Sequence, residues 1–169
     1  RSPGYVELWS PREAQDFAIC IDWAGVQPWS NGKVGINFLE KLQTATPAAL
    51  YGAMLAGVDA ILMGAGIPRE IPKLMTDFSQ GKPGQLSIDS DRPAGMAAPI
   101  LEFNPLESFG KAPELPRPAF LAIVTAEVLA SYLARDEITR PDGFVVEHFM
   151  AGGHNAPPRK LQDTETGYG

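Results

Sequence analysis

Side chains that bind metals or form cross-links are scarce in this sequence of 169 residues, which has one cysteine, Cys20, and two histidines. A single cysteine excludes a disulfide within the chain and a cysteine-based zinc site. Such cysteine usage is typical of a reducing compartment, so we expect a cytoplasmic protein without a structural metal.

Long apolar runs and an excess of positive charge are also absent. No run approaches the roughly 18 residues that a membrane span needs, and no basic start precedes an apolar segment as in a signal peptide. The formal net charge of −6 gives no general attraction for nucleic acid or anionic lipid. We therefore expect a small-molecule substrate, and neither nucleic acid nor a membrane as partner. Because the chain begins at Arg1 with a loop-like sequence, we also expect the natural protein to start earlier.

Glycine and proline, in contrast, are abundant, with 17 and 16 residues. They are densest between about 81 and 117, where no long helix can form. The chain length and the 44% hydrophobic content suit one domain. We expect a single domain over residues 1–169, with 81–117 as a mostly irregular insertion outside the core. This insertion could form one short hairpin, from 86–88 and 100–103, and we expect it to tolerate deletion.

Short apolar runs alternate with segments of helical periodicity along the rest of the chain. The runs are apolar throughout, which is typical of parallel strands covered by helices. The pattern predicts strands at 34–39, 58–63, 119–124 and 143–147, and helices at 10–23, 46–57, 71–78 and 126–135.

The first of these helices has clear sequence signals. Ser10 is suited to the N-cap, Pro11 to the first helical position, and Glu13 completes a capping box. Four apolar residues then follow at helical spacing, and the helix is expected to end near Gly25. The apolar residues of this segment are Ala14, Phe17, Ala18 and Ile21.

Parallel βα units occur in doubly wound sheets and in (βα)8 barrels. Only four strands are visible, whereas a complete barrel takes about 250 residues. We expect an α/β fold made of parallel (βα) units of a TIM barrel, of which this chain holds only a part. Because a partial barrel exposes strand edges and apolar faces, we expect a flanking segment or a second copy, in a homo-oligomer, to cover them.

Ligand sites in such folds lie beyond the carboxyl ends of the strands. Asn37 interrupts an apolar strand there, and its amide could either contact a planar ring or bond neighbouring backbone groups. Gly64-Ala65-Gly66 either admits a flat ligand close to the backbone or simply forms a tight turn. Thr125 is suited to a ligand contact or, more commonly, to the N-cap of the next helix.

The segment Ala151–Asn155 carries the strongest signal. Gly152 and Gly153 allow close approach of a ligand, and His154 is a proton-transfer side chain near neutral pH. The alternative is a polar loop with a solvated histidine. We expect His154 to be catalytic. No Ser-His-Asp or Cys-His arrangement, phosphate-binding loop or cluster of metal ligands is recognisable in the sequence.

Three motifs occur in an order known from one enzyme family: VGINFL at 34–39, GVDAILMGAGIP at 57–68 and AGGHN at 151–155. In this order and spacing the chain resembles the FMN-dependent nitronate monooxygenases, also called 2-nitropropane dioxygenase-like proteins. These share a barrel with the flavin-dependent enoyl-acyl carrier protein reductases. The similarity spans about 34–158, interrupted by the insertion.

The resemblance implies a TIM barrel with FMN lying across the carboxyl ends of its strands and His154 facing the substrate. No segment matches the loops that hold the FMN phosphate in the family. Thr125-Ala126-Glu127 stands where one branch has its catalytic histidine. The expected cofactor-binding residues are Asn37, Gly64, Ala65, Gly66, Thr125, Glu147, Gly152 and Gly153.

Two reactions are compatible with these residues: oxidation of alkyl nitronates with dioxygen, and reduction of an enoyl thioester with NADH or NADPH as co-substrate. Both place the redox chemistry on the flavin. A third interpretation is a non-catalytic barrel fragment that holds no flavin. A visible absorption spectrum of the purified protein separates the third interpretation from the other two.

Overall fold

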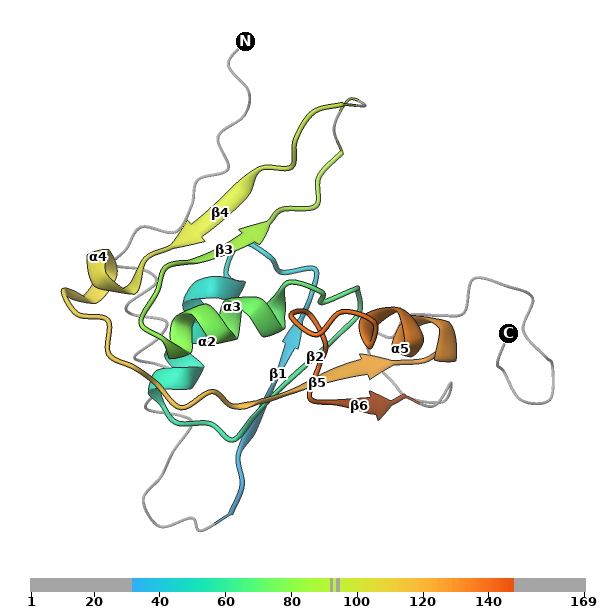
Figure 1. Cartoon of the computed structure of the whole chain (residues 1–169), viewed down its shortest axis with the longest axis horizontal. Helices are drawn as coiled ribbons and strands as arrows, with labels where there is room; N and C mark the ends of the chain where they lie inside the picture. The colour runs from blue at the N-terminus through green and yellow to red at the C-terminus, as the bar shows by residue number, and fades with distance from the viewer. Residues whose placement is uncertain (1–31, 92, 94, 148–169) are drawn as a thin grey trace.

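The computed structural model describes residues 32–91, 93 and 95–147 (Figure 1). Its main sheet has four strands in the order β1-β2-β5-β6, and a two-stranded hairpin, β3-β4, projects away from that sheet. The elements are β1 (Gly35–Leu39), α2 (Thr46–Leu55), β2 (Ala60–Gly64), α3 (Ile71–Ser79), β3 (Gly84–Ser87), β4 (Ile100–Phe103), α4 (Pro105–Phe109), β5 (Ala119–Val124), α5 (Glu127–Leu133) and β6 (Gly143–Val146).

All neighbouring strands of the main sheet are parallel. The α/β class and the four predicted strands are therefore confirmed, with strand ends that differ by one or two residues. The strand order shows no reversal, and no closed barrel is formed by the described residues. The helix expected at 10–23 lies outside these residues.

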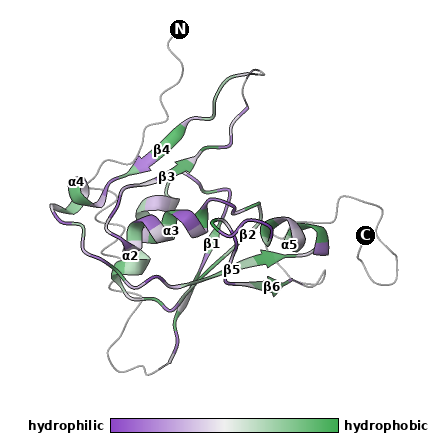
Figure 2. Ribbon diagram, in the orientation of Figure 1, coloured by the Kyte–Doolittle hydropathy of each residue, from purple (hydrophilic) through white to green (hydrophobic). Residues whose placement is uncertain are grey.

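One face of the main sheet carries the hydrophobic core. The central strands β2 and β5 contribute alternate side chains to it, and α2, α3 and α5 pack against those side chains. Figure 2 shows that β5 and β6 are hydrophobic along their lengths, as the sequence pattern indicated. Buried members of this core include Leu50, Ile61, Met63, Leu74, Phe120, Ala122 and Leu133.

Proline and glycine mark the helix ends as expected. Pro47 and Pro72 lie in the first turns of α2 and α3. Gly57 follows α2 with a φ of 72°, and its N–H donates to the Met54 carbonyl at 3.0 Å. The expectation for Thr125 as an N-cap is wrong, because α5 has Ala126 at that position. Within the described ranges, no helix combines the length and apolar character needed to cross a membrane.

The hairpin packs on α2 and α3 instead of lying outside the core. Leu86 and Phe103 belong to the core cluster. A Cβ at Gly84 would overlap the side chains of Leu74 and Phe78, so the backbone of β3 lies directly against α3. The segment 81–117 thus differs from the expected peripheral insertion. Its prolines do limit helix formation, since α4 has only five residues.

Tyr51 lies at the centre of an aromatic cluster beneath this hairpin. Its ring centroid is 5.3 Å from that of Phe78, 5.6 Å from Phe103 and 5.4 Å from Phe109. The Tyr51 hydroxyl is buried and has no hydrogen-bond partner among the described residues. Burial raises the pKa of this phenol above its usual value, because the charged form loses its hydration.

Replacing Tyr51 with Phe removes the unsatisfied hydroxyl and keeps the ring contacts. We expect Tyr51→Phe to raise the free energy of unfolding by about 1 kcal/mol, because a buried polar group without a partner costs about that much or more. Urea unfolding of the two proteins measures the difference. A loss of 1 kcal/mol or more, of the order of one hydrogen bond, would show that the hydroxyl is bonded in the folded protein.

Asp59 joins the start of β1 to the start of β2. Its Oδ2 accepts the Val34 N–H at 2.8 Å, and its own N–H donates to the Val34 carbonyl at 2.8 Å. Lys33 Nζ lies 2.6 Å from Oδ1. The hydrogen bond from Lys33, followed by that from Val34, lowers the pKa of the Asp59 carboxyl.

This lowered pKa makes stability depend on pH in the acidic range. A carboxyl group with a lowered pKa in the folded state stabilises the protein above its unfolded pKa, near 4, and the contribution is lost as pH falls through the folded pKa. We expect Asp59→Asn to lower the free energy of unfolding at neutral pH, and the difference from the unmodified chain to shrink toward about pH 2. Urea unfolding at a series of pH values measures this, and a difference that stays constant with pH would contradict it.

Candidate functional site

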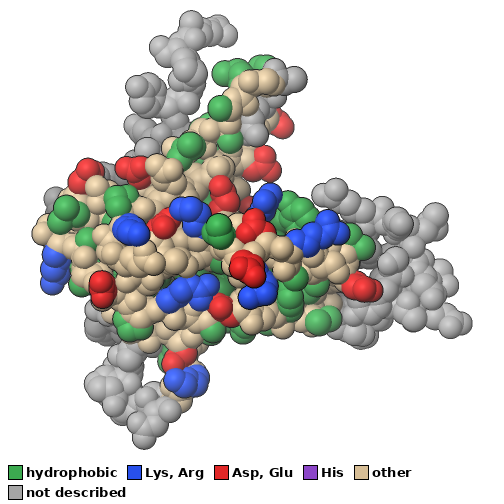
Figure 3. Space-filling model, in the orientation of Figure 1, with side chains coloured by type: hydrophobic (Ala, Val, Ile, Leu, Met, Phe, Trp, Pro, Cys, Tyr) green, Lys and Arg blue, Asp and Glu red, His purple; other side chains and the backbone are tan. Residues whose placement is uncertain are grey.

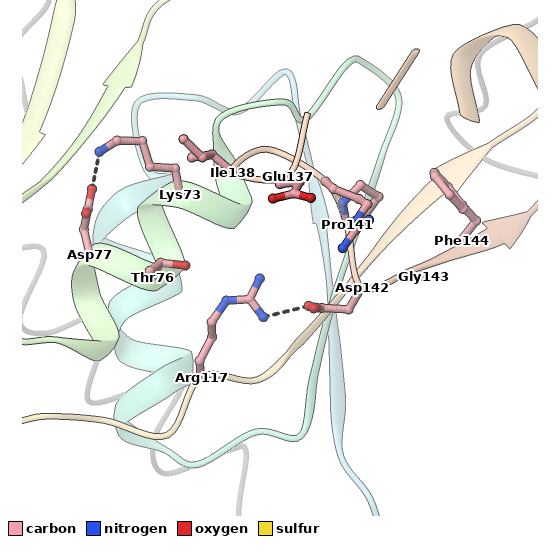
Figure 4. A pocket seen from close by; sticks show the side chains of 11 residues that line it. Lys73, Thr76, Asp77, Arg117, Glu137, Ile138, Pro141, Asp142, Gly143 and Phe144 are labelled. Carbon is pink, nitrogen blue, oxygen red and sulfur yellow. Dashed lines mark hydrogen bonds and ion pairs between the residues drawn. The ribbon is translucent and has the colours of Figure 1, made fainter. Parts of the chain in front are cut away.

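A cavity of about 790 Å³ lies between α3 and the loop that leads into β6 (Figure 4). This volume is in the range of small-molecule sites. The cavity lies at the amino ends of β5 and β6, since Arg117 precedes β5 and Asp142 directly precedes β6. Its charged lining residues are Lys73, Asp77, Arg117, Glu137, Arg140 and Asp142.

Four of these six charges neutralise each other in pairs. Lys73 Nζ lies 2.6 Å from Asp77 Oδ2, one turn away on α3. Arg117 Nη1 lies 2.7 Å from Asp142 Oδ2. Figure 4 shows both pairs at the wall of the cavity. Glu137 and Arg140 remain, and neither has an ion pair or a side-chain hydrogen bond to any other described residue.

The cavity therefore offers one free charge of each sign. Figure 3 shows the same balance on this face of the molecule, where acidic and basic side chains intermingle. Apolar side chains complete the lining, namely Ile138, Pro141 and Phe144. A ligand with a cationic and an anionic group and a small apolar part would match these features.

Asp142 holds both the sheet and the cavity wall in place. Its Oδ2 accepts the Phe120 N–H at 2.7 Å as well as Arg117 Nη1. Its N–H donates to the Phe120 carbonyl at 2.9 Å. This repeats the contacts of Asp59 with Val34 on the first pair of strands. The position of the Arg117 guanidinium thus depends on the same carboxylate that fastens β6 to β5.

We expect Asp142→Ala to lower the free energy of unfolding by about 1–3 kcal/mol, because it removes hydrogen bonds to a charged group and leaves the Phe120 N–H without its acceptor. Asp91→Ala is the matched control, since Asp91 is an exposed carboxylate away from the sheet. Denaturant unfolding of both variants tests this. Equal stabilities of the two variants would show that the carboxylate does not fasten the strands.

The residues singled out in the sequence lie elsewhere. Gly64, Thr125 and Glu147 lie at the carboxyl ends of β2, β5 and β6, and Asn37 is exposed on β1. The structure thus brings three of them to one edge of the sheet, opposite the edge with the charged cavity. The roles proposed for these residues stay predictions. Gly152, Gly153 and the expected catalytic residue His154 lie outside the described residues.

The turn after β2 does not fit a flavin cradle. A Cβ at Gly64 would lie 2.9 Å from Ile123 Cβ, and one at Gly66 would overlap the Glu40 side chain. Ala65 between them has a φ of 58° and is buried. Both glycines therefore make room for the chain's own side chains, and we derive no step through FMN. The expectations of FMN and of NAD(P)H stay predictions.

The sequence did not reveal the cavity residues, because ligand sites were expected only at the carboxyl ends of the strands. A signal was present at the amino ends. An aspartate directly precedes β2 and β6, and a lysine or arginine lies two residues before their partner strands, β1 and β5. The matching residues are Lys33 and Asp59 for β1–β2, and Arg117 and Asp142 for β5–β6.

Comparison with known proteins gives one partial similarity. A sequence model of the X-Pro dipeptidyl-peptidase (S15) family matches residues 1–37. Of this match, only residues 32–34 and the first three residues of β1 lie in the described structure. A search of curated proteins finds no match.

This match contradicts the resemblance to the nitronate monooxygenases and, with it, the function of a flavin-dependent oxidoreductase. The matched family consists of peptidases, which are hydrolases. The motifs at 34–39 and 57–68 cover β1, β2 and the glycine-containing turn after β2, and the motif at 151–155 lies outside the described residues. Parallel βα units of many functions need such turns, because the chain reverses tightly where each strand ends.

Proposed function

We propose that this protein belongs to the hydrolase class and binds a short zwitterionic peptide, of the X-Pro dipeptide kind, in the charged cavity. The observation that carries this proposal is that Glu137 and Arg140, two opposite charges without an ion pair to any described residue, line the same cavity. The partial match to an X-Pro dipeptidyl-peptidase family supports the peptide class of the ligand.

The lining suits each part of such a dipeptide. A guanidinium binds a carboxylate in a planar, two-pronged geometry, so Arg140 is suited to the carboxyl terminus of the ligand. Glu137 is suited to the α-ammonium group. Phe144 and Ile138 offer apolar contact to the proline ring. Because the other cations of the cavity are already paired, Arg140 is the residue whose removal should cost most affinity.

The proposal assigns recognition, and not bond cleavage, to the described residues. Peptide hydrolysis needs a group that attacks the carbonyl carbon or activates water. The G-x-S-x-G turn of α/β hydrolases occurs nowhere in the sequence. Cys20, His148 and His154 all lie outside the described residues.

The finer fold prediction, a segment of a (βα)8 barrel, stays a prediction. The sequential order of the four parallel strands, with their helices on one face, supports such a barrel segment. The same order supports a singly wound open sheet. The two differ in what covers the second face of the sheet.

Binding is tested by thermal unfolding and calorimetry with Ala-Pro as ligand. At ten times its Kd a ligand that binds only the folded state adds about 1.4 kcal/mol of stability. We expect Ala-Pro to stabilise the protein, and Arg140→Gln to weaken its binding about tenfold or more, as expected for loss of a charged hydrogen bond. Lys111→Gln, an exposed cation outside the cavity, is the matched control.

N-acetyl-Ala-Pro and Ala-Pro-amide each lack one charge and should bind more weakly than Ala-Pro. Equal binding of all three compounds, or equal effects of the Arg140 and Lys111 variants, would overturn the proposal. Hydrolysis is measured separately, by release of p-nitroaniline from Ala-Pro-p-nitroanilide. Ala-Pro binding without release would retain the recognition site and reject the hydrolase class.

A further inference from the structure

The main sheet has a second apolar face, turned away from α2, α3 and α5. Strand register places the residues that alternate with the core positions on this face. All five of its large apolar side chains are half-buried, and none belongs to the core cluster of the described residues. These residues, called the open face below, are Leu39, Leu62, Leu121, Ile123 and Val145.

Branched side chains of the open face lie beside glycines of the neighbouring strands. A Cβ at Gly35 would lie 3.2 Å from Leu62 Cδ1, and one at Gly143 would lie 3.0 Å from Leu121 Cδ2. Ile123 fills the space beside Gly64 in the same way. An apolar sheet face without large side chains at the glycine positions suits the packing of a helix across the strands.

We propose that the amino-terminal segment 10–23 of this chain covers the open face as an amphipathic helix. Its sequence has helix-start signals at Ser10 and an apolar stripe that includes Phe17 and Ile21. Parallel sheets are covered on both faces, and the helices of the described part cover only one. The proposal is independent of the dipeptide site, which lies on the other side of the sheet.

The chain length outside the described residues permits this arrangement. Segment 10–23 would form a helix of about 21 Å, and a helix is about 10 Å wide. The two outer strands of a four-stranded sheet lie about 14 Å apart. One helix of this length and width therefore covers most of the open face. The ten residues 24–33 reach about 33 Å when extended, which is enough to connect the helix to the start of β1.

The family match adds an independent argument for the same occupant. It spans residues 1–37 and so includes both this segment and the first part of β1. A second copy of the chain would have no such link to the open face.

Cys20 provides the test, because it is the only cysteine and lies within segment 10–23. Five full-length variants each receive one new cysteine at an open-face position, and mild oxidation followed by non-reducing electrophoresis and peptide mass mapping identifies the disulfides. We expect an intramolecular disulfide with Cys20 in at least one of the five, since a bond needs Cα atoms within about 7 Å. The matched control is Val128→Cys, which lies on exposed α5 on the other side.

Intramolecular disulfides at the open face but not at residue 128 support the proposal. Disulfide-linked dimers alone would assign the open face to a second copy of the chain. The absence of any Cys20 disulfide would leave the face to further strands of a barrel. Either result overturns the proposal.

Phe17→Asp and Ile19→Asp provide a second test, since the two residues lie on opposite sides of the proposed helix. Phe17→Asp should raise the fluorescence of the hydrophobic dye ANS and Ile19→Asp should not, and equal effects would also overturn the proposal.

Discussion

The two outer strand pairs of the sheet, β1–β2 and β5–β6, depend on carboxylates that fasten their amino ends. Asp59 and Asp142 each directly precede a strand and bind both the N–H and the carbonyl of the strand beside it. In a parallel sheet the strands are joined by long crossovers, so nothing local fixes their register. An aspartate at the start of one strand, bonded to a residue near the start of the next, supplies that fixed point. A cation beside each carboxylate, Lys33 or Arg117, completes the contact.

Strand positions were predictable because fully apolar runs between polar turns have few alternatives in a chain of this size. β5 contains only apolar residues, a pattern typical of a central strand in a parallel sheet. Helix starts were predictable where proline fixes the first turn, as at Pro47. The hairpin within 81–117 was foreseen as secondary structure but not as core, because alternating patterns do not reveal which element a strand will pack against.

The candidate site was not predictable in the same way. Arg117 and Asp142 are 25 residues apart and meet only because β5, α5 and the following loop return the chain to the same edge. The described motifs cover two apolar strands and the turn after β2, which are features common to many α/β proteins. They suggested a flavoenzyme, which the family comparison contradicts. Residues that distinguish one α/β protein from another lie in loops of variable length, where spacing carries little information.

The proposed ligand site and the sheet share Arg117, through its ion pair with Asp142. A ligand bound as proposed, by Arg140 and Glu137, would leave this pair intact and would stabilise the fold by an amount set by its concentration and its Kd. A ligand that draws the Arg117 guanidinium away from Asp142 must also weaken a contact that supports β6 on β5. The free energy needed to break the Arg117–Asp142 contact then offsets part of the binding free energy, so the apparent affinity of this ligand is lower. On the proposed function, the site would therefore favour ligands that use Glu137 and Arg140 over larger anions that need both arginines.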